Sequence, residues 1–161
     1  VLAHPPGYEL LQPCLDAAAD GAREGGGSFE VVDSMDAAFA DADVVYPKSW
    51  GPHQIMLSRV DANRLGDHVE MARLEQQALT QNAQHTHWIC DERAMALTRA
   101  GDALYMHCLP ADIGDEVSPG VMAKARVDVA REANKKVYVI MAMLASAKVS
   151  GLAERLQELA R

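Results

Sequence analysis

The stretch Leu104-Tyr105-Met106-His107-Cys108-Leu109-Pro110-Ala111 decides the fold of this chain. Its first half is apolar and typical of a buried β-strand, and Pro110 ends that strand because proline has no backbone N–H for the ladder. In α/β proteins, ligand chemistry lies in the loops that follow the carboxyl ends of parallel strands. We therefore expect Cys108, and the carbonyl groups of Cys108 and Leu109, to face a ligand.

Outward from this stretch, short apolar runs alternate with helical patterns, which is typical of βαβ units and a parallel sheet. We predict an α/β fold, a three-layer Rossmann-like domain with about five parallel strands. The strands are expected at residues 1–4, 28–32, 43–46, 103–107 and 126–130. Helices are expected at residues 8–24, 34–39, 67–81, 91–99, 134–149 and 152–160, and residues 50–66 as a loop with partial helical character.

The composition is that of an ordinary folded domain. The 161 residues are 49% hydrophobic and 24% charged, with a net charge of −8. This acidity argues against a nucleic-acid partner, because phosphate contacts need clustered lysine and arginine. The longest apolar run, residues 137–145, is far shorter than the roughly 20 residues of a membrane span. The three cysteines form no C-x-x-C pair and no signal peptide is visible, so we expect a reducing, cytoplasmic location.

The sequence gives little support for a metal or a nucleotide cofactor. His85-Thr86-His87 carries two histidines whose side chains would point apart on a strand, without an acidic third ligand at a fixed spacing. No G-x-G-x-x-G or Walker-type loop is present. We therefore expect no metal and no organic cofactor, and a dinucleotide-binding domain is only a third hypothesis for the function.

Three motifs together resemble the carbamoyltransferase family. Residues 107–110 read His-Cys-Leu-Pro, residues 46–51 read Tyr-Pro-Lys-Ser-Trp-Gly, and residues 81–85 read Gln-Asn-Ala-Gln-His. The first is similar to the signature of the ornithine-type enzymes and the second to the knotted acetylornithine branch. The residues of all three motifs together look most like those of the YgeW-type subgroup. The resemblance runs over residues 1–149 and concerns the carboxyl-terminal, amine-binding half of these enzymes.

This resemblance implies that residues 1–161 are the amine-binding domain and that an amino-terminal carbamoyl-phosphate domain precedes it. Val1-Leu2-Ala3 fits this expectation, because it reads as the tail of a strand without an initiating methionine. The resemblance further implies a knot completed between residues 50 and 88 and a homotrimer with shared active sites. The implied substrates are carbamoyl phosphate and an amino-acid-like amine.

The resemblance also implies roles for the His-Cys-Leu-Pro turn. His107 would donate from its ring to the carbamoyl oxygen, and Cys108 would orient the amine together with Leu109 and Pro110. Each role has a structural alternative. Cysteine is among the most buried residue types, and a histidine at a strand end is commonly a satisfied core group.

The remaining candidates belong to the second motif and the strand before it. The resemblance implies that Lys48 pairs with a substrate carboxylate, that Ser49 hydrogen-bonds it and that Trp50 shapes the pocket. Asp43 would bind the substrate amine, because a carboxylate suits an ammonium group. A solvated loop lysine and a strand-capping aspartate are the alternatives.

Two departures from the family pattern bear on the substrate. Asn134-Lys135 stands where the ornithine-type enzymes have an Asn-Arg pair that binds carbamoyl phosphate, and lysine keeps the charge but loses the bidentate fork. Ala111 and Asp112 follow the turn where the acetylornithine branch has an arginine, and Asp112 would repel a carboxylate. These departures argue against ornithine and acetylornithine as the amine. They keep open a hypothesis of another class, a non-catalytic ligand-binding or regulatory relative.

Overall fold

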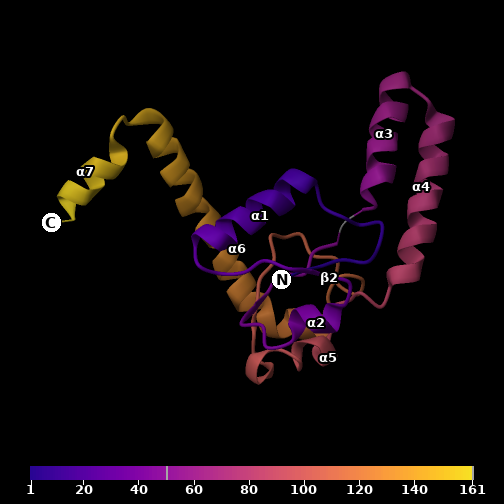
Figure 1. The fold of residues 1–161 in the computed structure, drawn as a ribbon, viewed down its shortest axis with the longest axis horizontal. Coiled ribbons are helices and arrows are strands. Elements are labelled where there is room, and N and C mark those ends of the chain that lie inside the picture. The colour runs from indigo at the N-terminus through magenta and orange to yellow at the C-terminus, as the bar shows by residue number, and fades with distance from the viewer. Residues whose placement is uncertain (50, 161) are drawn as a thin grey trace.

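The computed structural model describes residues 1–49 and 51–160, so the predicted pocket residue Trp50 lies outside the described residues. Short strands alternate with helices as far as β4, and a long bent pair of helices completes the chain (Figure 1). The elements are β1 (Leu2–Ala3), α1 (Gln12–Glu24), β2 (Val31–Val32), α2 (Met35–Phe39), β3 (Val44–Val45), α3 (His53–Leu65), α4 (His68–Asn82), η1 (Ala83–His85), α5 (Glu92–Met95), η2 (Arg99–Gly101), β4 (Leu104–Tyr105), α6 (Pro119–Lys148) and α7 (Leu152–Leu159).

The strands of the described residues form two separate parallel pairs, so parallel strands with helices between them are observed, whereas one sheet of about five strands is not. Strand β1 pairs with β2, and β3 pairs with β4 with Val44 opposite Leu104 and Val45 opposite Tyr105. Because β3 and β4 run in the same direction, the residues that follow them emerge at the same edge. This pairing brings the Lys48 motif beside the His-Cys-Leu-Pro turn.

The strand expected at residues 126–130 is wrong, because these residues lie inside α6, a helix of 30 residues. Val127 and Val129 alternate with charged residues and so imitate a strand. The buried positions of α6 are Val121, Ala125 and Val129, which recur every four residues as on one face of a helix. Ser118 begins the helix by accepting a hydrogen bond from the Val121 N–H at 3.1 Å.

The loop expected at residues 50–66 is also wrong, because His53–Leu65 forms helix α3. Gly66, at φ 68°, ends α3 in the left-handed conformation that glycine adopts at low cost. Helix α4 then runs back along α3, and the pair projects from the rest of the molecule (Figure 1). Its small core consists of Ile55, Ala62 and Leu74. Because this core is so small, few positions of α3 need an apolar residue. The sequence pattern of α3 is therefore weak, which explains why it indicated a loop.

The main core lies between the β3–β4 pair, α2, α5 and the first half of α6. Its buried members are Phe39, Val45, Cys90, Ala94, Tyr105, Val117, Val121, Ala125 and Val129. Helices α2 and α4 are confirmed close to their predicted bounds. Their predicted starts are confirmed as well, since the side chains of Ser34 and Asp67 accept backbone hydrogen bonds there.

The second half of α6 departs from the core and extends toward α7 (Figure 1). Its apolar side chains are exposed, namely Val137, Tyr138, Val139, Ile140, Met141, Met143 and Leu144. The helix expected at residues 134–149 is confirmed as this second half of α6, although its apolar side chains are not covered within the described residues. Among the described residues, no single helix is long and apolar enough to cross a membrane, and α6 with α7 meets that test only as a pair bent by 114°.

Candidate functional site

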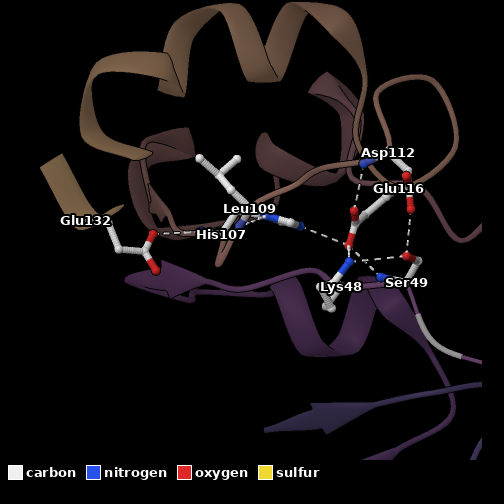
Figure 2. A network of polar contacts seen from close by, with 7 residues as sticks. All are labelled: Lys48, Ser49, His107, Leu109, Asp112, Glu116 and Glu132. Atoms are coloured by element: carbon white, nitrogen blue, oxygen red, sulfur yellow. Dashed lines mark hydrogen bonds and ion pairs between the residues drawn. The ribbon is translucent and has the colours of Figure 1, made fainter. Parts of the chain in front are cut away.

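The candidate site lies at the carboxyl edge of the β3–β4 pair. Lys48 and Ser49 leave β3 there, and the His107–Pro110 turn leaves β4 beside them. A third segment, residues 112–117, folds over the same edge and contributes Asp112 and Glu116. Figure 2 shows the polar contacts that join the three segments. The sequence indicated both motifs, but it predicted neither their proximity nor the third segment.

Glu116 is the centre of this network and is only 4% exposed. Its Oε1 accepts hydrogen bonds from the Ser49 backbone N–H and, at 3.2 Å, from Lys48 Nζ. Its Oε2 accepts one from the Asp112 N–H at 3.0 Å. The Asp112 carboxylate in turn accepts from the Ser49 hydroxyl at 3.0 Å. Three segments that are distant in the chain are thus joined through one buried carboxylate.

The Glu116 carboxylate is held in its ionised form. Burial by itself raises the pKa of Glu116, because a charge is poorly solvated inside a protein. The Asp112 N–H, the His107 ring, and the donors of Ser49 and Lys48 outweigh burial and hold the pKa below its ordinary value. The site therefore contains a fixed negative charge at neutral pH, directly beside the Lys48 ammonium.

His107 is fully buried in this network, and its ring is already engaged. The Leu109 N–H donates to Nδ1 at 2.8 Å, so that Nδ1 is an acceptor and the ring proton belongs on Nε2. Nε2 lies 3.0 Å from Glu116 Oε1, although its N–H is not aimed closely enough for a well-aligned hydrogen bond. The ring therefore faces the Glu116 carboxylate and shapes the turn, and its predicted donation to a carbamoyl oxygen stays a prediction for the complete protein.

Two further contacts fix the backbone and surroundings of His107. Its N–H donates to Glu132 Oε2 of α6 at 2.8 Å, which Figure 2 shows on the side away from Glu116. The rings of Tyr46 and Tyr105 lie nearly parallel to the imidazole, each with a centroid separation of 6.3 Å. The strand end is therefore held from both sides.

Cys108 is half-buried at the top of the turn. Interaction with the Cys108 side chain, together with burial, raises the pKa of Tyr46 to about 12. Lys136 Nζ donates to the Cys108 carbonyl oxygen at 2.6 Å. Leu109 has φ 48°, a left-handed conformation that is rare for a branched residue, and its peptide bond to Pro110 is cis. A left-handed conformation of a residue other than glycine is found preferentially at functional sites.

Two predicted site residues are not brought to this edge. Asp43 precedes β3, at the end opposite to Lys48, and its exposed carboxylate pairs with Arg99 at 2.8 Å. Lys135 lies over the ring of Tyr138 at 5.9 Å, on its own helix. Its neighbour Lys136 reaches the turn instead, because consecutive residues of a helix point about 100° apart.

A cavity of about 820 Å³ opens beside the network. Tyr46, Lys48 and Ser49 line it on one side, with Asp112, Asp115 and Glu116 nearby. Lys48 is the only lysine or arginine among its described lining residues, so the charge there is predominantly negative. Neither His107 nor Cys108 belongs to the lining, which places the turn behind the cavity wall.

The described residues contain no group of three or more histidine, cysteine or acidic side chains that could hold a metal ion. His85 and His87 have ring centroids 6.2 Å apart and pack on Tyr8 and Trp88. These histidines are therefore packing groups of the η1 region.

Sequence reasoning missed Glu116, Glu132 and Lys136, which make most of the polar contacts around the turn. Glu132 and Lys136 are charged residues of a helix with no motif around them, so no local signal distinguishes them from solvated side chains. Glu116 lies in a short irregular segment where periodicity carries no information. Only the tertiary fold reveals these residues.

Comparison with known proteins identifies the family of this chain. The family model "Aspartate/ornithine carbamoyltransferase, Asp/Orn binding domain" matches residues 1–147. The protein named carbamoyltransferase YgeW from Escherichia coli (strain K12) is 48% identical over 98% of this chain and 41% of the relative. N-acetylornithine carbamoyltransferase of Xanthomonas axonopodis pv. citri (strain 306) is 35% identical over 91% of this chain and 38% of the relative.

A solved structure has the same fold over most of the chain. It is a mutant N-acetyl-L-ornithine transcarbamylase complexed with carbamyl phosphate and N-succinyl-L-norvaline, with a TM-score of 0.67 and 33% identity. The alignment covers 90% of this chain and 39% of that one. The chain thus spans about two fifths of the length of these relatives. The Asp/Orn binding domain model matches residues 1–147 of the 161 residues. This chain therefore belongs to the aspartate/ornithine carbamoyltransferase family.

Proposed function

We propose that the complete protein transfers the carbamoyl group of carbamoyl phosphate to the amine of an amino-acid-like substrate. The products are a ureido compound and inorganic phosphate. The observation that carries this proposal is the meeting of the Lys48-Ser49 motif and the His107–Pro110 turn at one edge, beside a cavity, in a chain of this family. The names of the relatives support the same reaction.

The chemistry asks this domain to hold an amine and to present it uncharged to the carbamoyl carbon. Asp112, Asp115 and Glu116 attract an ammonium group into the cavity. Lys48 and Ser49 supply donors for the acceptor groups of the substrate. The turn at Cys108, Leu109 and Pro110 orients the amine from behind, without a covalent intermediate, and Trp50 completes the pocket wall in this proposal.

We also propose that a carbamoyl-phosphate domain precedes this amine-binding domain, residues 1–161, in the complete protein. The solved relative is complexed with carbamyl phosphate, and this chain matches only 39% of it. The exposed apolar side chains of residues 137–144 support the proposal, since a contiguous apolar surface of this kind marks an interface. A phosphate contact of Lys135 would belong to that domain interface and not to the edge described above.

Three further properties of the family enter as proposals for the complete protein. They are a homotrimer with shared active sites, a cytoplasmic location and a knot completed between residues 50 and 88. Light scattering on the purified protein measures the first, because a monomer and a trimer differ threefold in mass. A trimer supports the proposal, and a monomer that remains active contradicts it.

A non-catalytic ligand-binding relative is the second candidate. The observation in its favour is that the His107 ring lies between the Leu109 N–H and the Glu116 carboxylate, and that Lys135, in place of an arginine, lies over the ring of Tyr138. Such a protein would bind an amine or carbamoyl phosphate without releasing phosphate.

The test is phosphate release from carbamoyl phosphate by the complete protein with a panel of amino acids, diamines and ureido-pathway amines. We expect release with one amine, and a loss of about 100-fold in turnover in Cys108→Ala, because a misplaced reacting group costs about that factor. Cys14→Ala is the matched control, since Cys14 is exposed on α1. Phosphate release that is unaffected by Cys108→Ala contradicts the proposed role of the turn. Folded protein that binds but never releases phosphate favours the second candidate.

A further inference from the structure

We propose that Glu116 is a positioning residue that holds Lys48 and Ser49 in place for the amine substrate. The inference rests on the proposed function, because it concerns substrate binding at the same edge. Glu116 does not itself contact the reacting atoms in this account. It acts through the groups whose hydrogen bonds it accepts.

The first step of the argument is that the backbone of Glu116 is rigidly held. The Cys90 N–H donates to the Glu116 carbonyl at 3.0 Å, and the Ser118 N–H donates to the Cys90 carbonyl at 2.9 Å. Val117, the next residue, is fully buried in the main core. The carboxylate is therefore presented from a fixed point, as a preorganised site requires.

The second step is that the carboxylate collects donors from separate segments. Ser49 and Asp112 each give it a backbone N–H, Lys48 gives it an ammonium, and the ring of His107 lies against it. Removal of the carboxylate would leave these donors without their acceptor in a partly buried region, which is costly. Glu116 thus joins the Lys48-Ser49 motif, which lines the cavity, to the turn behind the cavity wall.

The third step concerns Lys48, whose side chain is 35% exposed and lines the cavity. An ammonium group has three N–H donors. One is directed to Glu116 Oε1 at 3.2 Å and one to Ser49 Oγ at 3.3 Å. In this geometry the third donor is available to an acceptor in the cavity, in a direction fixed by the other two.

Glu116→Gln separates this role from a general effect on folding, because glutamine has the same shape and lacks the charge. With the complete protein, we expect the amine KM to rise about tenfold and kcat to change less than threefold. The free energy of a hydrogen bond to a charged group corresponds to at least a tenfold change in affinity. Glu75→Gln, an exposed carboxylate on α4, is the matched control and should change neither constant.

The decisive readout is a double-mutant cycle with Lys48→Met. If Glu116 acts through Lys48, both single variants raise the amine KM and the double variant raises it no further than Lys48→Met alone. Additive effects, or an unchanged KM in Glu116→Gln, overturn the proposal. A purely structural role for Glu116 predicts the additive result.

Amide hydrogen exchange tests the inference without any substrate. We expect the Ser49 and Asp112 amides to exchange about tenfold faster in Glu116→Gln, because they lose a charged acceptor. The Gly114 amide, which donates to the Val117 carbonyl at 2.8 Å, should keep its rate and so reports on the fold of the loop. Unchanged Ser49 and Asp112 amides overturn the inference. If the wild-type protein lacks transferase activity, the proposed function is contradicted. The exchange result still tests the role of Glu116, because it needs no substrate.

Discussion

The two halves of helix α6 have opposite environments although both are rich in apolar residues. In the first half, Val121, Ala125 and Val129 are buried against the main core, and Glu132 holds the His107 backbone. In the second half, residues 137–144 expose their apolar side chains to solvent. The difference indicates that the first half serves the site within this domain. The second half has the composition of a core helix, and in the arrangement proposed above the preceding domain covers it.

The largest expected difference between the two halves comes from matched valine truncations. Val129 is 2% exposed and Val139 is 58% exposed. We expect Val129→Ala to lower the free energy of unfolding of this domain by about 2 kcal/mol, because it removes buried methyl groups and leaves a cavity. Val139→Ala should change it by less than about 0.5 kcal/mol.

Urea denaturation of both valine variants measures the difference. Equal decreases in the free energy of unfolding of the two variants in the isolated domain would contradict the contrast between the halves. In the complete protein, a decrease for Val139→Ala as well would show that another domain covers the second half.

The next effect is a pH dependence that belongs to the site under the first half. The pKa of folded Glu116 lies below its ordinary value, so ionised Glu116 stabilises the fold above the unfolded pKa of about 4.3. That contribution is lost as the pH falls through the folded value. We expect the free energy of unfolding to fall more steeply in acid for the wild type than for Glu116→Gln. Denaturation midpoints measured between neutral pH and acid check this, and parallel curves would be inconsistent with an ionised Glu116.

A smaller effect is expected in the core that the first half covers. The Tyr105 hydroxyl is buried and has no hydrogen-bond partner among the described residues. Burial also raises its pKa, so the hydroxyl stays protonated. Tyr105→Phe should leave the stability unchanged or raise it by about 1 kcal/mol, because an unpaired polar group is removed. Thermal unfolding measures this, and a clear destabilisation would reveal a partner for the hydroxyl.

The smallest effect is expected on the exposed side of the first half. Arg131 pairs with Asp128 at 3.0 Å, and both side chains are largely exposed. Arg131→Ala should lower the free energy of unfolding by about 0.3 kcal/mol, because solvent and salt screen such pairs. Repeating the denaturation at high salt should abolish the difference. A decrease in the free energy of unfolding of more than about 1 kcal/mol would show that the exposed side of the first half also stabilises the domain.

The sequence predicted those parts of the fold that depend on local patterns. The strand positions around Val44 and Leu104 and the capped start at Asp67 carry their own signals, and all are confirmed. The parallel strand rule placed each motif at the carboxyl end of its own strand. The strand predicted at residues 126–130 is wrong because alternating valines on a helix can imitate a strand. Helix α3 was not predicted in full because its core is too small to produce a clear helical periodicity of apolar residues.

The composition of the site was less accessible than its location. The sequence indicated Lys48, Ser49 and the His107–Pro110 turn, but it assigned a ligand contact to Asp43, which the strand direction places at the other end. It also gave His107 a donor role toward a carbamoyl oxygen, whereas the ring of His107 faces the Glu116 carboxylate in this chain. The buried carboxylate that joins the motifs comes from a loop, where only tertiary contacts reveal a role.

The central claim is that the edge beside Lys48 binds the amine. The most direct test is to measure both Michaelis constants in Lys48→Met of the complete protein, with Lys124→Met on the exposed side of α6 as the control. The account predicts that the amine KM rises about tenfold or more, as for loss of a charged contact, while the carbamoyl-phosphate KM stays within about twofold. An equal rise in both constants, or a rise in the carbamoyl-phosphate KM alone, would contradict the account.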